Sequence, residues 1–368
     1  MHQDITKTQV KGTLMNSGDH PQNRFLHYLA IDGYASGICS IQTTSDVLNW
    51  KRFLGSLCLV LVILLFLTGC VMMFFYSPAP GIAYDSVDYA QFSLLWGDVV
   101  RGVHHYAWNM LLIVMGLHLL SAFFTGAFKT PRQLVWISGL LILLVAPLLI
   151  ITGDLLPWDQ KGYWTTQVRI SIIQSIPVVG EFCLRILQGG TRTGIVALTR
   201  FYTLHCVFLP VLIIGFVCVH FHFIAHHGLA DPLHQLSTNR RKVPLIPHII
   251  NRWMLLFMVT AVILAILSVY WPAPLDSPAD PTDSAFVPKP EWWVLALNQL
   301  VTIFKGQLML IGTIVIPGGL TALLLALPFL DCSSERRPSH RIVSMCLAIV
   351  ILIALTVLSI MGYVAHFG

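Results

Sequence analysis

The sequence predicts an all-α polytopic membrane protein with about seven transmembrane helices. The chain has 368 residues, of which 56% are hydrophobic and 11% are charged, against about 25% charged residues in a typical soluble domain. Its mean hydropathy is +0.74. Seven long segments contain no Asp, Glu, Lys or Arg, and about 20 apolar residues are enough for a helix to cross a bilayer. These observations favour a bundle of membrane-spanning helices.

The seven segments divide the chain into its predicted regions. They cover residues 53–76, 102–128, 133–153, 201–226, 253–271, 307–330 and 342–365. Residues 1–50 are mixed polar, and we expect them to form a cytoplasmic N-terminal extension. A four-helix domain is expected over 51–226, a basic cytoplasmic connector over 227–252, and a three-helix C-terminal domain over 253–368.

The basic residues of the loops predict the orientation of the chain. The N-terminal region and alternate loops share one side of the membrane and carry 14 of the 22 Lys and Arg residues. Because Lys and Arg concentrate in cytoplasmic loops, we expect the N-terminus in the cytoplasm and the C-terminus outside the inner (cytoplasmic) membrane. This asymmetry accounts for the net charge of +5, so there is no reason to expect nucleic acid as a partner.

Four histidines form two matched pairs within two of the predicted spans. His104 and His118 stand at an i, i+14 interval, and His205 and His220 stand at an i, i+15 interval. Each spacing is close to four helical turns, so the members of a pair lie near one face of a helix, roughly 21–22 Å apart. Two such helices side by side would present two bis-histidine sites, one in each half of the bilayer. Polar residues in spans usually mark a function, and two axial imidazoles suit a haem iron that transfers electrons.

Glycines in two other predicted spans repeat the first histidine interval. Gly55 and Gly69 are related by i, i+14, and so are Gly139 and Gly153. A glycine lets a helix backbone come close to a flat porphyrin. Close packing between helices is the alternative explanation.

Two arginines lie near the outer end of the predicted ladder of sites. Arg101 is three residues before His104, and Arg200 is five residues before His205. Each is expected to pair with haem propionates or, alternatively, to extend towards the membrane surface. The eight cysteines include no C-x-x-C-H motif, so we expect haem to be held without covalent attachment.

Four sequence runs point to a known family. They are RGVHHYAWNMLLIVMGLHLL, GAFKTPRQLVWISG, TGDLLPWDQKGYW and LTRFYTLHCVFLPVLIIGFVCVHFH. These runs resemble cytochrome b of the Rieske/cytochrome b quinol oxidases, and the i, i+15 interval of the second pair resembles the photosynthetic branch in particular. In that branch the four-helix haem subunit and a three-helix partner, subunit four, are separate chains, whereas this sequence resembles the two fused into one.

The motif Pro290-Glu291-Trp292-Trp293 follows the fifth predicted span. It resembles the Pro-Glu-Trp-Tyr motif that lines the quinol-oxidising pocket of the family, with tryptophan in place of the tyrosine. Quinol oxidation releases protons, and a carboxylate at the edge of a semi-apolar pocket can accept one. The resemblance therefore implies that Glu291 is the catalytic proton acceptor.

The resemblance implies a membrane cytochrome b subunit of a bc-type complex, with two non-covalent haem b groups held by His104 with His205 and by His118 with His220. Quinol at the outer side would pass one electron to a Rieske iron–sulfur protein. The other would pass through the two haems to a quinone at the cytoplasmic side, coupled to proton translocation. The implied partners are the Rieske protein, a cytochrome c-type subunit, quinone, membrane lipid and a second copy in a homodimeric complex. The implied activity is that of a quinol:cytochrome c (or similar acceptor) oxidoreductase of a respiratory chain.

Some positions depart from the photosynthetic pattern. Phe53 stands where that branch has the cysteine that attaches a third haem, and Ala225 stands where it has an arginine that assists this haem. No covalent third haem is therefore expected. His226 lies close to the position of a quinone-binding histidine in respiratory relatives, which makes it a candidate quinone ligand. A loop histidine without that role is the alternative.

Two further expectations concern the helices. In the family, the segment 154–195 forms surface helices that roof the outer pocket. From periodicity alone, its amphipathic run Val168–Val179 predicts an interfacial helix. Three prolines, Pro147, Pro210 and Pro317, fall inside predicted spans and are expected to kink them.

Two other classes of protein are compatible with parts of this pattern. A haem b subunit of a different quinone-linked membrane oxidoreductase would pass electrons without bifurcation, but it would need neither the last three spans nor the motif around Glu291. A proton-coupled transporter could use His and Glu as a relay, but it would show no haem absorbance.

Overall fold

The computed structural model describes residues 42–44, 50–190, 192–228 and 242–367. Seven of its helices are long and apolar enough to cross a membrane, which confirms the predicted number. They are α2 (Trp50–Met73), α4 (Gly97–Phe124), α5 (Gln133–Asp154), the continuous pair α8 (Ile195–Thr203) and α9 (Leu209–His227), α10 (Leu245–Tyr270), α12 (Ile316–Leu330) and α13 (Ile342–Phe367). Most of the predicted extension 1–50 and part of the predicted connector lie outside the described residues.

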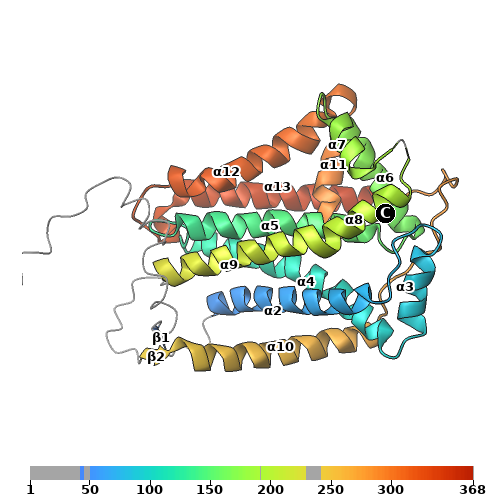
Figure 1. Ribbon diagram of the computed structural model, residues 1–368. Coiled ribbons are helices and arrows are strands. Elements are labelled where there is room, and N and C mark those ends of the chain that lie inside the picture. Colours follow the sequence, from blue (N-terminus) through green and yellow to red (C-terminus); the bar gives the residue numbers. More distant parts are fainter. Residues whose placement is uncertain (1–41, 45–49, 191, 229–241, 368) are drawn as a thin grey trace, which may run out of the picture.

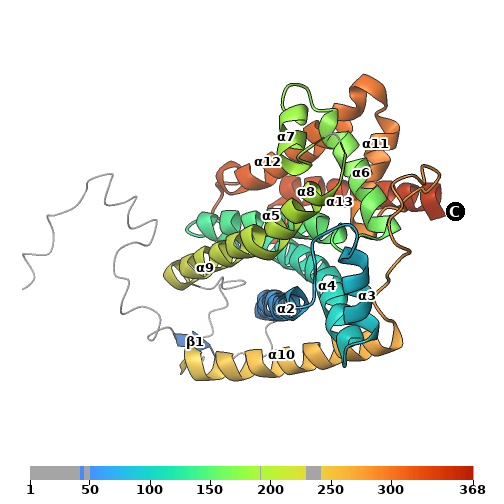
Figure 2. The same ribbon diagram turned by 45° about the vertical axis from the view of Figure 1, so that its right-hand side comes forward.

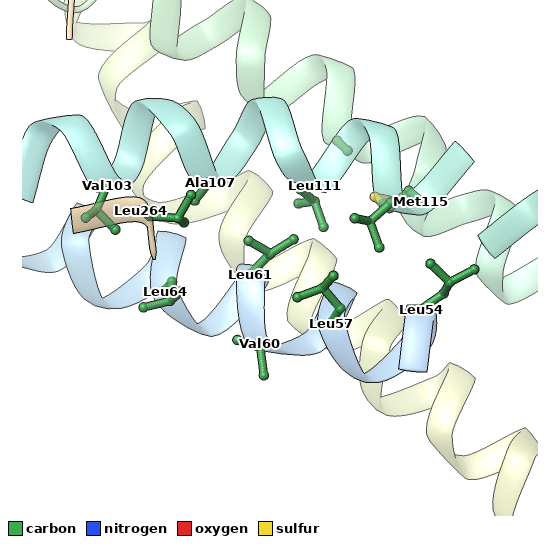
Figure 3. Packing of buried hydrophobic residues seen from close by; sticks show 12 residues of the cluster. Leu54, Leu57, Val60, Leu61, Leu64, Val103, Ala107, Leu111, Met115 and Leu264 are labelled. Carbon is green, nitrogen blue, oxygen red and sulfur yellow. The ribbon is translucent and has the colours of Figure 1, made fainter. Parts of the chain in front are cut away.

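The long helices run roughly parallel (Figure 1). Among the described elements, α2 and α4, the first two spans, are in the most extensive contact. Leu57, Leu61 and Leu64 form one stripe on α2, because spacings of three and four residues return to the same helix face. Figure 3 shows this stripe against α4, whose small Ala107 lets the two backbones come close. In lipid, such van der Waals packing replaces the hydrophobic effect as the force that holds helices together.

The last three spans lie on two different sides of the first four. Helix α10 packs against α2 and α4, whereas α12 lies beside α5 and α13 follows it on that same side (Figures 1 and 2). Contact between α10 and α4 is close at Gly102, where an added Cβ would stand 2.4 Å from the Cβ of Ser268. The three C-terminal spans therefore flank the first four from both sides.

One end of the bundle carries short helices and the other carries two short strands (Figure 1). The first end holds α3 (Ala83–Phe92), α6 (Gln160–Gln174), α7 (Gly180–Leu187) and α11 (Leu295–Ile303). At the opposite end β1 (Gln42–Thr44) pairs antiparallel with β2 (Lys242–Pro244). The structure corrects one detail here: the amphipathic run Val168–Val179 is not one helix, because α6 ends at Gln174 and a turn precedes α7.

Single turns of other helix types complete the described elements. The 3₁₀ turns are η2 (Trp292–Val294), η3 (Gly306–Leu308) and η5 (Pro338–His340), and the π-helical turns are η1 (Leu204–Phe208) and η4 (Ile311–Val315). Each π turn directly precedes a helix with a proline in its first turn. Pro210 and Pro317 therefore begin helices, whereas Pro147 lies inside α5.

A buried polar cluster joins the two halves of the chain at the end that carries the strands. Lys129, which follows α4, donates to Asp331 Oδ1 at 2.6 Å and to the Ser333 side-chain oxygen at 2.7 Å. Arg341 Nε donates to Asp331 Oδ2 at 2.9 Å, and the Arg341 guanidinium lies over the ring of Phe123. Both cations are buried, so the cluster connects the α4–α5 loop firmly to the α12–α13 loop.

Candidate functional site

A cavity of about 860 Å³ lies between α2, α4, α5 and the α8–α9 helix, at the end of the bundle that carries α3 and α6. Its lining includes His104 and His205, Gly69 and Gly153, and also Glu291 from the loop after α10. This volume lies within the usual range for small-molecule sites, about 300–1,000 Å³. The structure thus brings one predicted histidine pair and the predicted proton acceptor to the same cavity.

The imidazoles of His104 and His205 face one another from α4 and from the turn before α9. Their ring centres are 6.3 Å apart. An imidazole nitrogen binds a transition metal at about 2 Å, so two rings on opposite sides of one metal ion have centres roughly 6 Å apart. The spacing therefore fits two histidines that would hold one metal ion between them.

Each of the four predicted glycines faces one of the four histidines. A Cβ added at any of them would stand 2.6–3.5 Å from an imidazole Cε1 atom. The pairs are Gly69 with His104, Gly55 with His118, Gly153 with His205 and Gly139 with His220. The glycines therefore make room for the imidazole rings, and α2 supports the histidines of α4 as α5 supports those of η1 and α9.

Hydrogen bonds set the tautomer of His104 and His205. The Nδ1 atom of His205 lies 2.9 Å from the Leu149 carbonyl, which can only accept, so this nitrogen carries the hydrogen. The Thr68 hydroxyl donates to the Leu64 carbonyl and lies 2.9 Å from His104 Nδ1, so it accepts from the imidazole. Both histidines keep Nε2 unprotonated, which is the state that a metal ligand needs.

His220, in the other pair, has the same kind of support. The Ser138 hydroxyl donates to the Leu134 carbonyl at 2.8 Å and lies 2.9 Å from His220 Nδ1. The imidazole is therefore the donor, and its Nε2 atom is again available for a metal.

His118 is the exception among the four. Its Nδ1 atom is buried and has no hydrogen-bond partner among the described residues. Three of the four glycines are directly preceded by a hydroxyl residue that lies near the Nδ1 atom of the facing histidine: Thr68, Ser138 and Thr152. The residue before the fourth glycine is Leu54. Sequence analysis missed this pattern, although the repeated hydroxyl-glycine pairs are visible in the sequence.

The π turn η1 explains the unequal histidine intervals. It contains His205, and the Leu209 N–H donates to the Leu204 carbonyl, five residues back. A single π turn inserts one residue into an α-helix. The interval between His205 and His220 is one residue longer than that between His104 and His118. Because the π turn takes up this extra residue, the two pairs are separated by the same length of regular helix.

The donor set fits a haem better than a bare metal ion. No group of three or more His, Cys, Asp or Glu side chains that could hold a metal occurs in the part of the chain that the structure describes. A porphyrin brings four nitrogen ligands of its own, so two imidazoles complete its iron. The glycine-lined imidazoles, three of which donate from Nδ1, agree with this fit.

The two predicted propionate partners have protein partners in the structure. Arg101 lines the cavity and donates to Gln91 and to the carbonyls of Ala273 and Pro274. Arg200 donates to the carbonyls of Arg185 and Ile186 at the end of α7. The propionate role of both arginines stays a prediction, as does the quinone role of His226, whose ring centre lies 4.9 Å from that of His227.

Glu291 lies at the start of η2 and forms an ion pair with Lys161 of α6. The next residue, Trp292, donates from Nε1 to the Asn109 side-chain oxygen at 2.7 Å and so ties this loop to α4. Sequence analysis did not identify Lys161, which also lines the cavity. The one available signal was a lysine inside the run LPWDQKGYW.

The N-cap of α6 fixes the wall of the cavity near this ion pair. Asp159 Oδ1 accepts from the Gly162 N–H at 2.8 Å, and Asp159 Oδ2 accepts from the Asp276 N–H at 3.2 Å. Burial raises the pKa of Asp159 above its ordinary value, against the opposing effect of these two hydrogen bonds. The loop after α10 is therefore held against the start of α6.

Comparisons with known proteins agree with this geometry. The family model described as cytochrome b (N-terminal)/b6/petB matches residues 109–278, and the one described as cytochrome b (C-terminal)/b6/petD matches residues 278–366. Cytochrome b6 of Prochlorococcus marinus (strain MIT 9303) is 38% identical over 209 residues, which are 57% of this chain and 95% of that protein. Cytochrome b6 of Acaryochloris marina (strain MBIC 11017) is 39% identical over 180 residues, which are 49% of this chain and 84% of that protein.

A solved structure also resembles the whole fold. A chain of a hyperthermophilic respiratory Complex III superposes with a TM-score of 0.76 and 25% sequence identity, over 87% of this chain and 85% of that one. The regions that match the N-terminal and the C-terminal cytochrome b models are therefore both present in one polypeptide. The chain belongs to the cytochrome b family and is a haem-binding, multi-pass membrane subunit of a bc-type oxidoreductase complex.

Proposed function

We propose that this subunit oxidises quinol at the end of the bundle that carries α6, and that the electrons divide there. One electron passes to a Rieske iron–sulfur protein, and the other crosses the membrane to a quinone site at the opposite end. A cytochrome c-type subunit, or a similar acceptor, takes the electron from the Rieske protein, and the complex translocates protons as quinol and quinone turn over.

The observation that best supports this proposal is the composition of the outer cavity. Glu291 and the facing imidazoles of His104 and His205 line the same space. A quinol bound there is within reach of a carboxylate that takes a proton and of a histidine pair suited to an electron carrier. The apolar lining, which includes Phe66, Met73 and Ile213, suits the isoprenoid tail of a quinol.

Two haem b groups, one between His104 and His205 and one between His118 and His220, would supply reversible one-electron chemistry in each half of the bilayer. The protein residues fix the ligands. Nδ1 hydrogen bonds orient three of the four imidazole rings, and the glycines of α2 and α5 leave room for the rings between the helices. The rise of about 21 Å along the helix, from one histidine of a span to the other, then separates the two haem positions along the membrane normal.

The direction of transfer follows from the loop charges. Under the positive-inside rule, the end that carries the strands faces the cytoplasm and the cavity with Glu291 faces outward. We place quinone reduction at the cytoplasmic end, where His226 is the candidate ligand, and we expect a homodimeric complex. Phe53 and Ala225 favour two non-covalent haems without a covalent third.

Replacement of Glu291 tests the proton-acceptor role. We expect Glu291→Gln to slow quinol oxidation by about 100-fold or more, because general base catalysis contributes about 10²–10⁴ in rate. Both haem spectra should stay unchanged, since Glu291 is not one of the four histidine ligands. The measurement is steady-state oxidation of a short-chain benzoquinol in membranes that hold the assembled complex.

The matched control for this variant is Glu335→Gln, which removes a partly exposed carboxylate from the opposite end of the bundle. It should oxidise quinol at the wild-type rate. Wild-type turnover in Glu291→Gln would show that this carboxylate is not the proton acceptor.

A further inference from the structure

Lys161 is the cation that contacts the carboxylate of Glu291. Its ammonium donates to Glu291 Oε1, and both residues line the outer cavity. Lys161 is 42% exposed and Glu291 is 18% exposed. The pair therefore lies at the boundary between the cavity and water.

Lys161 is held in place by its own helix. It is the second residue of α6, whose first turn is capped by Asp159 and whose first residue, Gln160, donates its N–H to the Ser277 carbonyl at 2.9 Å. The loop that carries Glu291 is anchored separately through Trp292 and Asn109. The contacts of α6 and those of the Glu291 loop thus bring the ammonium and the carboxylate together.

Two other ionisable groups, Asp154 and His105, lie near Glu291 without a hydrogen bond or ion pair to it. Asp154 of α5 is paired with Arg169 at 2.6 Å. His105 of α4 meets the rings of Tyr106 and Trp108 edge-on. Among the described residues, Lys161 is the cation that forms an ion pair with Glu291.

From this geometry we propose that Lys161 is a positioning residue for quinol oxidation: it holds the Glu291 carboxylate turned into the cavity until a quinol proton arrives. This inference rests on the proposed role of Glu291. Oxidation of the quinol releases two protons and two electrons. One quinol O–H bond breaks as its proton joins the Glu291 carboxylate, and the proton of the second O–H goes to water at the cavity boundary. The two electrons go to the iron–sulfur and haem acceptors of the proposed function, and Lys161 takes up no proton in the step.

The ion pair also accounts for the release of the proton from Glu291 after its transfer. A carboxylate attracts the ammonium, and the attraction strengthens when a bound quinol excludes water from the cavity. Once the proton has been taken, the neutral carboxylic acid no longer attracts Lys161, so the side chain can rotate away and deliver the proton to water. The lysine thus holds the acceptor in place before the step and releases the neutral acid after it.

The test compares Lys161→Met, Lys161→Arg and Lys305→Met in membranes with the assembled complex and a short-chain benzoquinol. Lys161→Met should lower kcat at saturating quinol by about tenfold or more and leave KM near the wild-type value, because the carboxylate is no longer held where the proton is transferred. Lys161→Arg should restore kcat. Lys305→Met makes the same change in net charge by removing an exposed lysine that is not part of the cavity lining, and it should leave kcat unchanged.

A double-mutant cycle with Glu291→Gln completes the test. If Lys161 acts through Glu291, then Lys161→Met should have no further effect in the Glu291→Gln background. A wild-type kcat in Lys161→Met, or an equal loss in both backgrounds, would overturn the inference.

The outcomes separate this inference from the proposed function. Full turnover in Glu291→Gln removes the proton-acceptor role itself. Loss of turnover in Glu291→Gln, together with a wild-type kcat in Lys161→Met, removes only the role of Lys161. Unchanged haem spectra in every variant show that the subunit has folded and assembled.

Discussion

At the scale of single residues, the four histidines differ in what supports them. His104, His205 and His220 each hold the Nδ1 hydrogen through a hydroxyl or carbonyl oxygen, whereas the Nδ1 atom of His118 is buried without a partner among the described residues. A hydrogen bond from Nδ1 raises the basicity of the ligating nitrogen. We therefore expect His118 to be the weakest electron donor of the four ligands.

Supplying the missing hydroxyl tests this difference. Leu54→Thr should offer His118 the acceptor that Thr68 offers His104, and stronger donation from the ring should lower the midpoint potential of the inner haem by stabilising ferric iron. The potential of the outer haem should not move. The measurement is a redox titration of both haems in membranes.

Leu54→Val is the control for that titration. Valine has the shape of threonine without its hydroxyl, so it reproduces the loss of buried volume at this core position, where Leu54 is 7% exposed. If the two variants shift the inner potential equally, packing and not the hydrogen bond is the cause.

The sequence predicts much of the site at this scale and misses its supporting atoms. The histidine and glycine intervals are visible because a helix repeats its faces regularly, and the structure brings each glycine to a histidine. Lys161 was missed because its partner Glu291 lies far along the chain, in the loop after α10. No local pattern encodes such a contact.

At the scale of the helices, the π turn η1 keeps both histidine pairs in register. Pro210 lacks the N–H that would continue a regular helix, and the π turn before it takes up one extra residue. The sequence indicated a kink at this proline. It could not indicate the π turn, because that depends on how the whole helix packs against α5.

Removing the extra residue tests the register directly. Deletion of Val207 combined with Pro210→Ala should form a regular helix whose histidine interval equals that of α4, and both haems should be retained. Inserting one alanine after Val207 should instead rotate His220 by about 100° and cost one haem. Haem content per chain, from the reduced-minus-oxidised spectrum, is the measurement.

The single variant Pro210→Ala is the reference for both length changes and should keep two haems. Loss of a haem from the deletion variant, with Pro210→Ala intact, would contradict the one-residue role of the π turn.

At the scale of the whole molecule, the polar cluster around Asp331 joins two halves that resemble separate subunits in the photosynthetic branch. Burial alone would raise the pKa of Asp331, but hydrogen bonds from Lys129, Arg341 and Ser333 outweigh it and hold the pKa below the ordinary value of 3.8. The cluster therefore stabilises the folded chain above that pH, and its contribution is lost as the pH falls through the lower, folded-state pKa.

Asp331→Asn should reduce the free energy of unfolding by about 2 kcal/mol at neutral pH, because it removes charge-assisted hydrogen bonds from two buried cations. Thermal melting in detergent, followed by circular dichroism, measures the change. The difference from wild type should narrow as the pH falls below 4. Glu181→Gln, which removes an exposed ion pair with Arg185, should melt as wild type does, and equal losses in both variants would contradict the special role of the cluster.

The overall arrangement was predictable in part. Seven spans follow from hydropathy, and the structure confirms them. The placement of α10 apart from α12 and α13 does not follow from the sequence. Hydropathy shows which segments enter the bilayer, but it does not show which helices they pack against. The two short strands β1 and β2 are also absent from an all-α prediction, since three residues are too few to form a readable alternation.

The central claim is a ladder of two bis-histidine haems across the membrane, and a redox titration of His220→Ala tests it most directly. Wild type should titrate as two b-type components, both removed by acid–acetone extraction. His220→Ala should retain one component, and His222→Ala, two residues away, should retain both. Two remaining components in His220→Ala, or haem left on the chain after extraction, would contradict the account.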